Sequence, residues 1–168
     1  MILERAGALT QARGERMDFV VQKATELGVS GLLPLLAERS VVRLTAQQVE
    51  RRLNHWRAIA IAACEQSGRN RLPAIAVPVP LEDFLRGNRD GSTRLLLSPA
   101  ATSTLADVPR LVTAVTVLIG PEGGLAEAEQ QAAVAAGFTP VRLGPRVLRT
   151  ETAAIAALTL LQREFGDL

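Results

Sequence analysis

Residues 115–124 read Val-Thr-Val-Leu-Ile-Gly-Pro-Glu-Gly-Gly, an almost wholly apolar run that passes directly into a glycine-rich turn. Such a run is typical of a central parallel strand, which is buried on both faces. A helical pattern follows from about Leu125 to Ala136, and Gly137 can end it. The order of strand, turn and helix predicts one unit of an α/β fold.

The rest of the chain repeats this alternation. Helices are expected at about 15–27, 45–66, 81–86 and 150–165, and short apolar strands at 32–36, 74–77, 94–97 and 140–143. Pro34 inside the first of these strands indicates an edge or an end of pairing. We therefore predict the α/β class, with a parallel sheet flanked by helices, over residues 15–168. The polar, glycine-containing stretch 1–14 is predicted to be a tail or a linker.

Composition narrows the classes of function. The chain has 168 residues, 48% of them hydrophobic, and no apolar run approaches the length of a membrane span. Cys64 is the only cysteine and is interpreted as a small core residue, so the cytoplasm is the expected compartment. No group of His, Cys, Asp and Glu has metal-ligand spacing, and the single histidine, His55, supports no Ser-His-acid triad. We predict no metal and no membrane partner.

The basic residues are almost all arginine. Of 19 lysines and arginines, only Lys23 is lysine, and the net charge is +2. Arginine suits phosphate and base contacts, but a GC-rich genome raises the arginine content as well. Only four Phe and one Trp are present, too few for a stacking platform, so any RNA would be held by shape, phosphate contacts and a pocket for one base.

Three loops should meet at one edge of the sheet. Residues 97–99, 119–124 and 143–152 each follow an apolar strand. Because ligands in open α/β sheets bind outside the carboxyl ends of the strands, these loops predict a pocket.

The loop 119–124 is the most informative of the three. It lacks the Gly-Lys-Ser/Thr of a P-loop and the spacing of a dinucleotide fingerprint. Two glycines alone would explain a tight turn, but Glu122 between Gly-Pro and Gly-Gly favours a functional role. In the third loop, Thr150 and Glu151 fit an N-cap and a helix-dipole partner. Arg149 before them is left unexplained by that structural interpretation.

Several motifs, taken together and in order, resemble a known family. They are Gln22–Val29, Glu38-Arg39-Ser40, Glu65-Gln66-Ser67-Gly68-Arg69, residues 119–124 and residues 143–153. From about Arg16 to its end the chain resembles the ribosomal RNA uridine N3-methyltransferases of the SPOUT superfamily.

The resemblance implies a fold, a cofactor and partners. It implies a deep C-terminal trefoil knot, a homodimer, and a target uridine N3 in small-subunit ribosomal RNA on an assembled particle. Members usually carry an N-terminal β-barrel, so residues 1–14 would be the linker that follows such a barrel. Bent S-adenosylmethionine (SAM) would be held largely by backbone groups of the three loops, at Leu97, Ser98, Pro99, Ile119, Gly120, Pro121, Gly123, Gly124, Leu143, Gly144, Val147, Leu148 and Thr150.

Roles for charged residues follow as hypotheses from their place at this edge. Glu122 or Glu151 would accept the N3 proton, and Arg149 would stabilise charge on a uracil oxygen. The expected RNA contacts are Arg39, Gln66, Arg69 and Arg71. Two alternatives remain open. One is a knotted ribose 2′-O-methyltransferase, which would typically show an Asn-rich motif near the last helix, and the other is a non-catalytic RNA-binding or assembly module.

Overall fold

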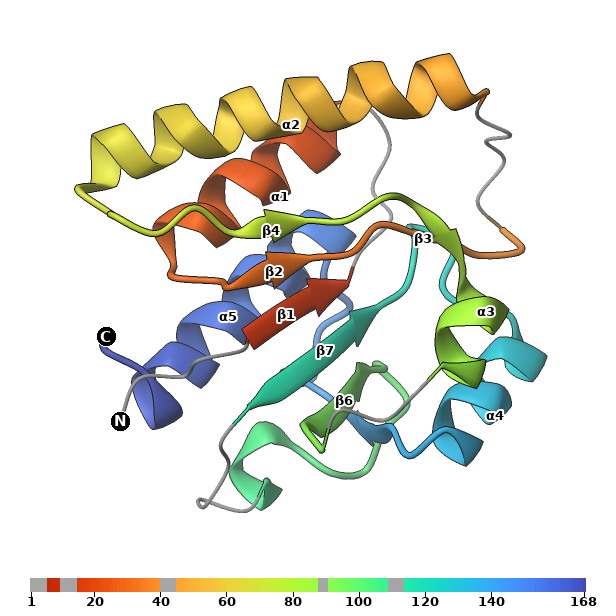
Figure 1. Ribbon diagram of the computed structural model, residues 1–168. Helices are drawn as coiled ribbons and strands as arrows, with labels where there is room; N and C mark the ends of the chain where they lie inside the picture. Colours follow the sequence, from red (N-terminus) through yellow and green to blue (C-terminus); the bar gives the residue numbers. More distant parts are fainter. Residues whose placement is uncertain (1–5, 10–14, 40–44, 88–90, 109–113) are drawn as a thin grey trace.

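A six-stranded parallel sheet forms the centre of the computed structural model, which describes residues 6–9, 15–39, 45–87, 91–108 and 114–168 (Figure 1). The strand order is β4-β2-β1-β7-β6-β8. A separate pair, β3 with β5, is also parallel. The strands are β1 Ala6–Leu9, β2 Gly31–Leu32, β3 Leu35–Leu36, β4 Ala74–Ile75, β5 Val79–Pro80, β6 Thr93–Leu97, β7 Val115–Ile119 and β8 Thr139–Val141.

The helices begin and end close to the predicted positions. They are α1 Glu15–Glu26, α2 Ala46–Ser67, α3 Leu81–Arg86, α4 Glu127–Ala135 and α5 Thr150–Phe165, with a 3₁₀ turn at Leu105–Asp107. Thr45 caps α2 through its side chain, which accepts a hydrogen bond from the backbone N–H of Gln48. Gly68 ends α2 in the left-handed conformation, with φ 71°. These local signals explain why the limits of α2 are readable from sequence.

Helices cover both faces of the strands β6 and β7. Leu95 and Val117 pack with Ala154 and Ala157 of α5. The alternate residues Leu96 and Leu118 belong to a second buried cluster, whose other members are Leu35, Ala37, Leu81, Leu125, Ala133, Ala136 and Phe138. Alternating side chains of the same strands therefore serve two cores, as expected for a sheet between helical layers. The predicted α/β class is confirmed.

Residues Ala6–Leu9 correct the prediction that the opening stretch is a linker. They form β1, which pairs in parallel with β2 and with β7 in the interior of the sheet. The sequence Ala-Gly-Ala-Leu carries no β-branched residue and no alternation, so its strand state comes from hydrogen bonds to its two neighbours and not from local propensity. Residues 1–5 and 10–14 lie outside the described part of the chain.

The stretch 32–36 is two strands and not the one predicted. β2 belongs to the main sheet and β3 to the two-stranded sheet, with Pro34 between them. Proline has no N–H to donate, and the Pro34 carbonyl accepts from the N–H of Val79 at 3.2 Å. The predicted end of pairing at Pro34 is confirmed.

Candidate functional site

A cavity of about 480 Å³ lies at the carboxyl ends of β6, β7 and β8. All three loops predicted to meet at this edge contribute to its wall. The lining residues are Arg16, Leu96, Leu97, Ser98, Pro99, Ile119, Gly120, Pro121, Glu122, Gly124, Leu125, Gln130, Val141, Arg142, Leu143, Gly144, Arg146, Val147, Leu148, Arg149, Thr150 and Ala153. The topology therefore does bring the three segments together.

Every residue predicted to contact the cofactor lines this cavity except Gly123. Its carbonyl instead accepts a hydrogen bond from Arg39 Nη1 at 2.7 Å. A Cβ placed on Gly123 would meet Arg39 Cδ at 3.7 Å. Gly123 therefore contacts Arg39 and is not part of the described wall.

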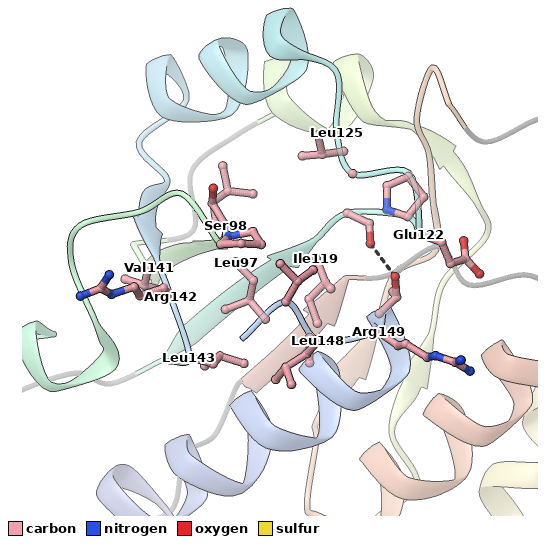
Figure 2. A pocket seen from close by; sticks show the side chains of 18 of the residues that line it. Leu97, Ser98, Ile119, Glu122, Leu125, Val141, Arg142, Leu143, Leu148 and Arg149 are labelled. Carbon is pink, nitrogen blue, oxygen red and sulfur yellow. Dashed lines mark hydrogen bonds between the residues drawn. The ribbon is translucent and has the colours of Figure 1, made fainter. Parts of the chain in front are cut away.

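The interior of the cavity is apolar. Leu97, Ile119, Leu143 and Leu148 come from the three loops and lie close together in Figure 2. A pocket with apolar walls and a few polar groups at its edge suits a small organic ligand.

Thr150 connects the second and third loops. Its side chain is not the predicted N-cap, because Arg149 occupies the cap position and Thr150 is the first residue of α5. The Thr150 hydroxyl donates to the Gly120 carbonyl at 3.2 Å, the dashed line in Figure 2. Thr150 is buried, so this hydrogen bond holds the start of α5 against the glycine turn.

Two glycines of the turn are required for different reasons. Gly124 has φ 68° and its N–H donates to the Pro121 carbonyl at 2.8 Å, which closes the turn. At Gly120 a Cβ would lie 3.1 Å from Leu125 N and 3.3 Å from Leu125 Cγ, tighter than most real contacts. The turn depends on a left-handed residue at one end and a close approach at the other.

The mouth of the cavity is mainly basic. Among the described residues, Glu122 is the only acidic one in the wall, and its Oε1 lies 2.8 Å from Arg16 Nη1. Arg142, Arg146 and Arg149 are exposed, and no carboxylate of the described residues is within ion-pair distance of them. Figure 2 shows Glu122 and Arg149 on one side and Arg142 on the other. Such a mouth can attract a polyanion.

Glu151 does not line the cavity, in contrast to the other two catalytic candidates, Glu122 and Arg149. It occupies the first turn of α5, where a carboxylate complements the helix dipole. Its Oε2 atom is buried and has no hydrogen-bond partner within the described part of the chain.

The candidate RNA contacts separate into two groups. Arg39 lies beside the glycine turn. Gln66, Arg69 and Arg71 lie at the end of α2 and before β4, at the amino ends of the strands and so opposite the cavity. Ser40, the last residue of the Glu38-Arg39-Ser40 motif, is outside the described residues.

Arg69 has a structural contact that the sequence did not predict. Its Nη1 donates to the Thr25 carbonyl at 2.8 Å and its Nη2 to the Val29 carbonyl at 2.6 Å. Burial disfavours the charged guanidinium and lowers the pKa of Arg69, with Cys64 opposing this effect. Arg69 thus joins the end of α2 to the end of α1.

The sequence reasoning missed several residues of the wall. Arg16 precedes the apolar pattern of α1 and carries no motif of its own, so only the fold places it beside Glu122. Arg142 directly precedes the third loop and Arg146 belongs to it, so their place next to this loop could have identified them. Gln130 of α4 also lines the wall, and its side-chain amide donates to the Leu125 carbonyl at 3.1 Å.

The described residues contain no group of three or more His, Cys, Asp or Glu side chains that could hold a metal ion. Among the same residues, no helix combines the length and the apolar character needed to cross a membrane.

Residues 6–162 match the family model of the RNA methyltransferase domain. The chain belongs to this family. The match includes β1 and all three loops of the cavity, so the RNA methyltransferase domain and the described sheet coincide almost completely.

Named relatives agree with this assignment. Ribosomal RNA small subunit methyltransferase E of Buchnera aphidicola subsp. Schizaphis graminum is 40% identical over 94% of the chain, which spans 64% of that relative. A solved putative methyltransferase from Legionella pneumophila, in complex with the bound cofactor SAM, is 44% identical with a TM-score of 0.91, over 98% of this chain and 69% of that one. A ribosomal RNA small subunit methyltransferase E from Neisseria gonorrhoeae, bound to S-adenosyl methionine, is 39% identical with a TM-score of 0.87, over 95% and 66%.

The chain thus spans about two thirds of the length of these relatives. It spans 64% of the Buchnera protein named above and 62% of the protein of the same name from Buchnera aphidicola subsp. Acyrthosiphon pisum.

Proposed function

We propose that this chain is a SAM-dependent methyltransferase domain that modifies uridine N3 in small-subunit ribosomal RNA. The observation that carries the proposal is the single cavity formed by the loops after β6, β7 and β8. Family membership and the names of the relatives support the RNA substrate, and solved relatives were crystallised with SAM.

The residues of the cavity fit this cofactor. Its volume of about 480 Å³ is within the range for small-molecule sites. Leu97, Ile119 and Leu148 can pack on a flat adenine ring. A Cβ on Gly144 would meet no atom within 4 Å, so the third loop leaves space beside its backbone. When bound, SAM supplies a methyl group already activated for transfer to a nucleophile.

The residues of this chain would orient the target base and move its proton. Glu122 would accept the N3 proton, with its carboxylate held at the rim by Arg16. Arg149, exposed on the same side of the cavity, would stabilise the charge that develops on a uracil oxygen. Glu151 lies outside the wall, which makes Glu122 the better-placed proton acceptor.

Phosphate contacts would come from arginines at the mouth of the cavity. Arg142 and Arg146 at the mouth have exposed guanidinium groups suited to a phosphate. The predicted contacts of Gln66 and Arg71 would require RNA to extend to the opposite edge of the sheet.

We also propose the trefoil knot. The chain that leaves β8 is hydrogen-bonded to the loop between β6 and β7, because the N–H of Arg142 donates to the Ser103 carbonyl at 2.9 Å and Arg142 pairs with Thr104. α5 then packs on α1, β1 and β7 at the middle of the sheet. This return from the edge strand to the centre favours passage of the C-terminal segment through that loop.

The remaining proposals concern assembly and location. A homodimer is supported by exposed apolar side chains, with Val147 at the cavity 80% exposed and Leu160 of α5 42% exposed. Sedimentation at several concentrations would test it. A ribosomal substrate in turn supports the cytoplasm as the place of action.

Mass spectrometry of nucleosides tests the reaction directly. The chain is incubated with small ribosomal subunits and isotopically labelled SAM, and the rRNA is digested. We expect labelled N3-methyluridine. A labelled 2′-O-methyl nucleoside would support the ribose alternative, whereas a chain that binds RNA and shows no heat of SAM binding in calorimetry would support a non-catalytic module. Within an active reaction, Glu122→Gln should slow transfer more than Glu151→Gln.

A further inference from the structure

Two arginines contact consecutive residues of the glycine turn, residues 119–124. Arg16, in the first turn of α1, pairs with the Glu122 carboxylate at 2.8 Å. Arg39, in the segment after β3, donates to the Gly123 carbonyl at 2.7 Å. Arg39 therefore contacts the one residue of the turn that does not line the cavity.

The segment that carries Arg39 is itself fixed to Ala126, two residues after the turn. The Glu129 carboxylate accepts from the backbone N–H of Glu38 at 2.7 Å through Oε1, and from the N–H of Ala126 at 2.9 Å through Oε2. Glu129 thus bridges the neighbour of Arg39 and Ala126, the N-cap residue of α4. Hydrogen bonds to charged groups are shorter and stronger than neutral ones.

These contacts form a closed ring around the outer side of the turn. The Arg39 side chain holds the turn at Gly123, and the Glu129 carboxylate holds both Ala126, two residues after the turn, and the backbone N–H of Glu38. The backbone between residues 38 and 39 closes the ring. The other side of the turn, at Gly120 and Gly124, is the wall of the cavity. A shift of the outer side therefore moves the wall.

We propose that Arg39 is a positioning residue that fixes the glycine turn of the methyl-donor pocket, with Glu129 as its support. The expected effect on SAM binding rests on the proposed function, whereas the positioning of the turn by Arg39 does not. It assigns to Arg39 a role different from the phosphate contact expected from sequence.

The test compares Arg39→Ala, Arg39→Lys and Glu129→Gln with the control Arg57→Ala, an exposed arginine of α2 for which no side-chain contact is described. Hydrogen exchange is measured in the SAM-free chain at the amides of Gly124 and Ala126, both of which are hydrogen-bonded. Loss of one charge-assisted hydrogen bond should speed this exchange about tenfold in Arg39→Ala. Arg39→Lys should recover part of the protection, Glu129→Gln should shift exchange in the same direction, and Arg57→Ala should match wild type.

Calorimetry on the same variants measures SAM affinity, which should weaken about tenfold in Arg39→Ala while the midpoint of thermal unfolding shows that the variant is folded. Unchanged exchange and unchanged SAM affinity in Arg39→Ala would overturn the proposal. A loss of RNA affinity alone, with normal exchange, would overturn it in favour of a phosphate contact. If wild type binds no SAM, the proposed function fails, and the exchange rates still decide the role of Arg39.

Discussion

Replacement of Arg69 by alanine should destabilise the fold, because the guanidinium donates to two backbone carbonyls at the end of α1. The distances are 2.8 Å to Thr25 and 2.6 Å to Val29. At about 1.5 kcal/mol for each hydrogen bond of a charged group, the gross contribution is about 3 kcal/mol. Partial exposure of Arg69 and the cost of burying its charge reduce this, so we expect a net loss of about 2 kcal/mol.

A loss of this size should lower the midpoint of thermal unfolding by roughly 4–8 °C in a chain of this length. Trp56 is the only tryptophan, is buried between α2 and α1, and reports unfolding by fluorescence. Arg69→Lys should lose about half as much, since one ammonium cannot reproduce both contacts of the guanidinium. The control Arg57→Ala should change the midpoint little. The reasoning is refuted if Arg69→Ala unfolds at the same temperature as Arg57→Ala.

Three further predictions concern single contacts. Thr150→Val removes the hydroxyl that donates to the glycine turn and should cost about 1 kcal/mol in urea unfolding, with weaker SAM binding; equal SAM affinity would count against the link between the loops. Gly124→Ala should lower the free energy of unfolding by about 1–2 kcal/mol, because residue 124 has a φ of 68°. Gly123→Ala should stay within about 0.5 kcal/mol of wild type, because its Cβ would meet only ordinary contacts. Equal effects of the two substitutions would contradict this. Hydrogen bonds from the N–H and hydroxyl of Thr104 lower the pKa of Asp107. The Asp107 carboxylate should therefore stabilise the fold above its ordinary pKa, and this stabilisation should be lost as pH falls through the lowered pKa. An NMR titration that places the pKa of Asp107 at or above its ordinary value would exclude the effect.

The sequence predicts best those elements whose signals are local. The apolar run before Gly120 identifies β7, and Thr45 with Gly68 marks both ends of α2. Because all described strands of the main sheet are parallel, the loops after β6, β7 and β8 emerge at the same edge. The cavity could therefore be predicted before its geometry was known.

Other features depend on partners distant in the chain. Ala6–Leu9 are a strand only because β2 and β7 lie on either side. Thr150 satisfies every local rule for an N-cap, yet its hydroxyl donates to a carbonyl 30 residues earlier. Arg39 and Arg69 resemble phosphate ligands in sequence, and only the fold shows that each donates to backbone carbonyls.

NMR chemical-shift mapping with SAM tests the central claim most directly. The account predicts that the backbone amides of the non-proline residues in 97–99, 119–124 and 143–150 shift together and saturate at one equivalent per chain, while amides 66–71 at the opposite edge of the sheet do not. Shifts confined to one of the three loops, or centred on residues 66–71, would contradict it.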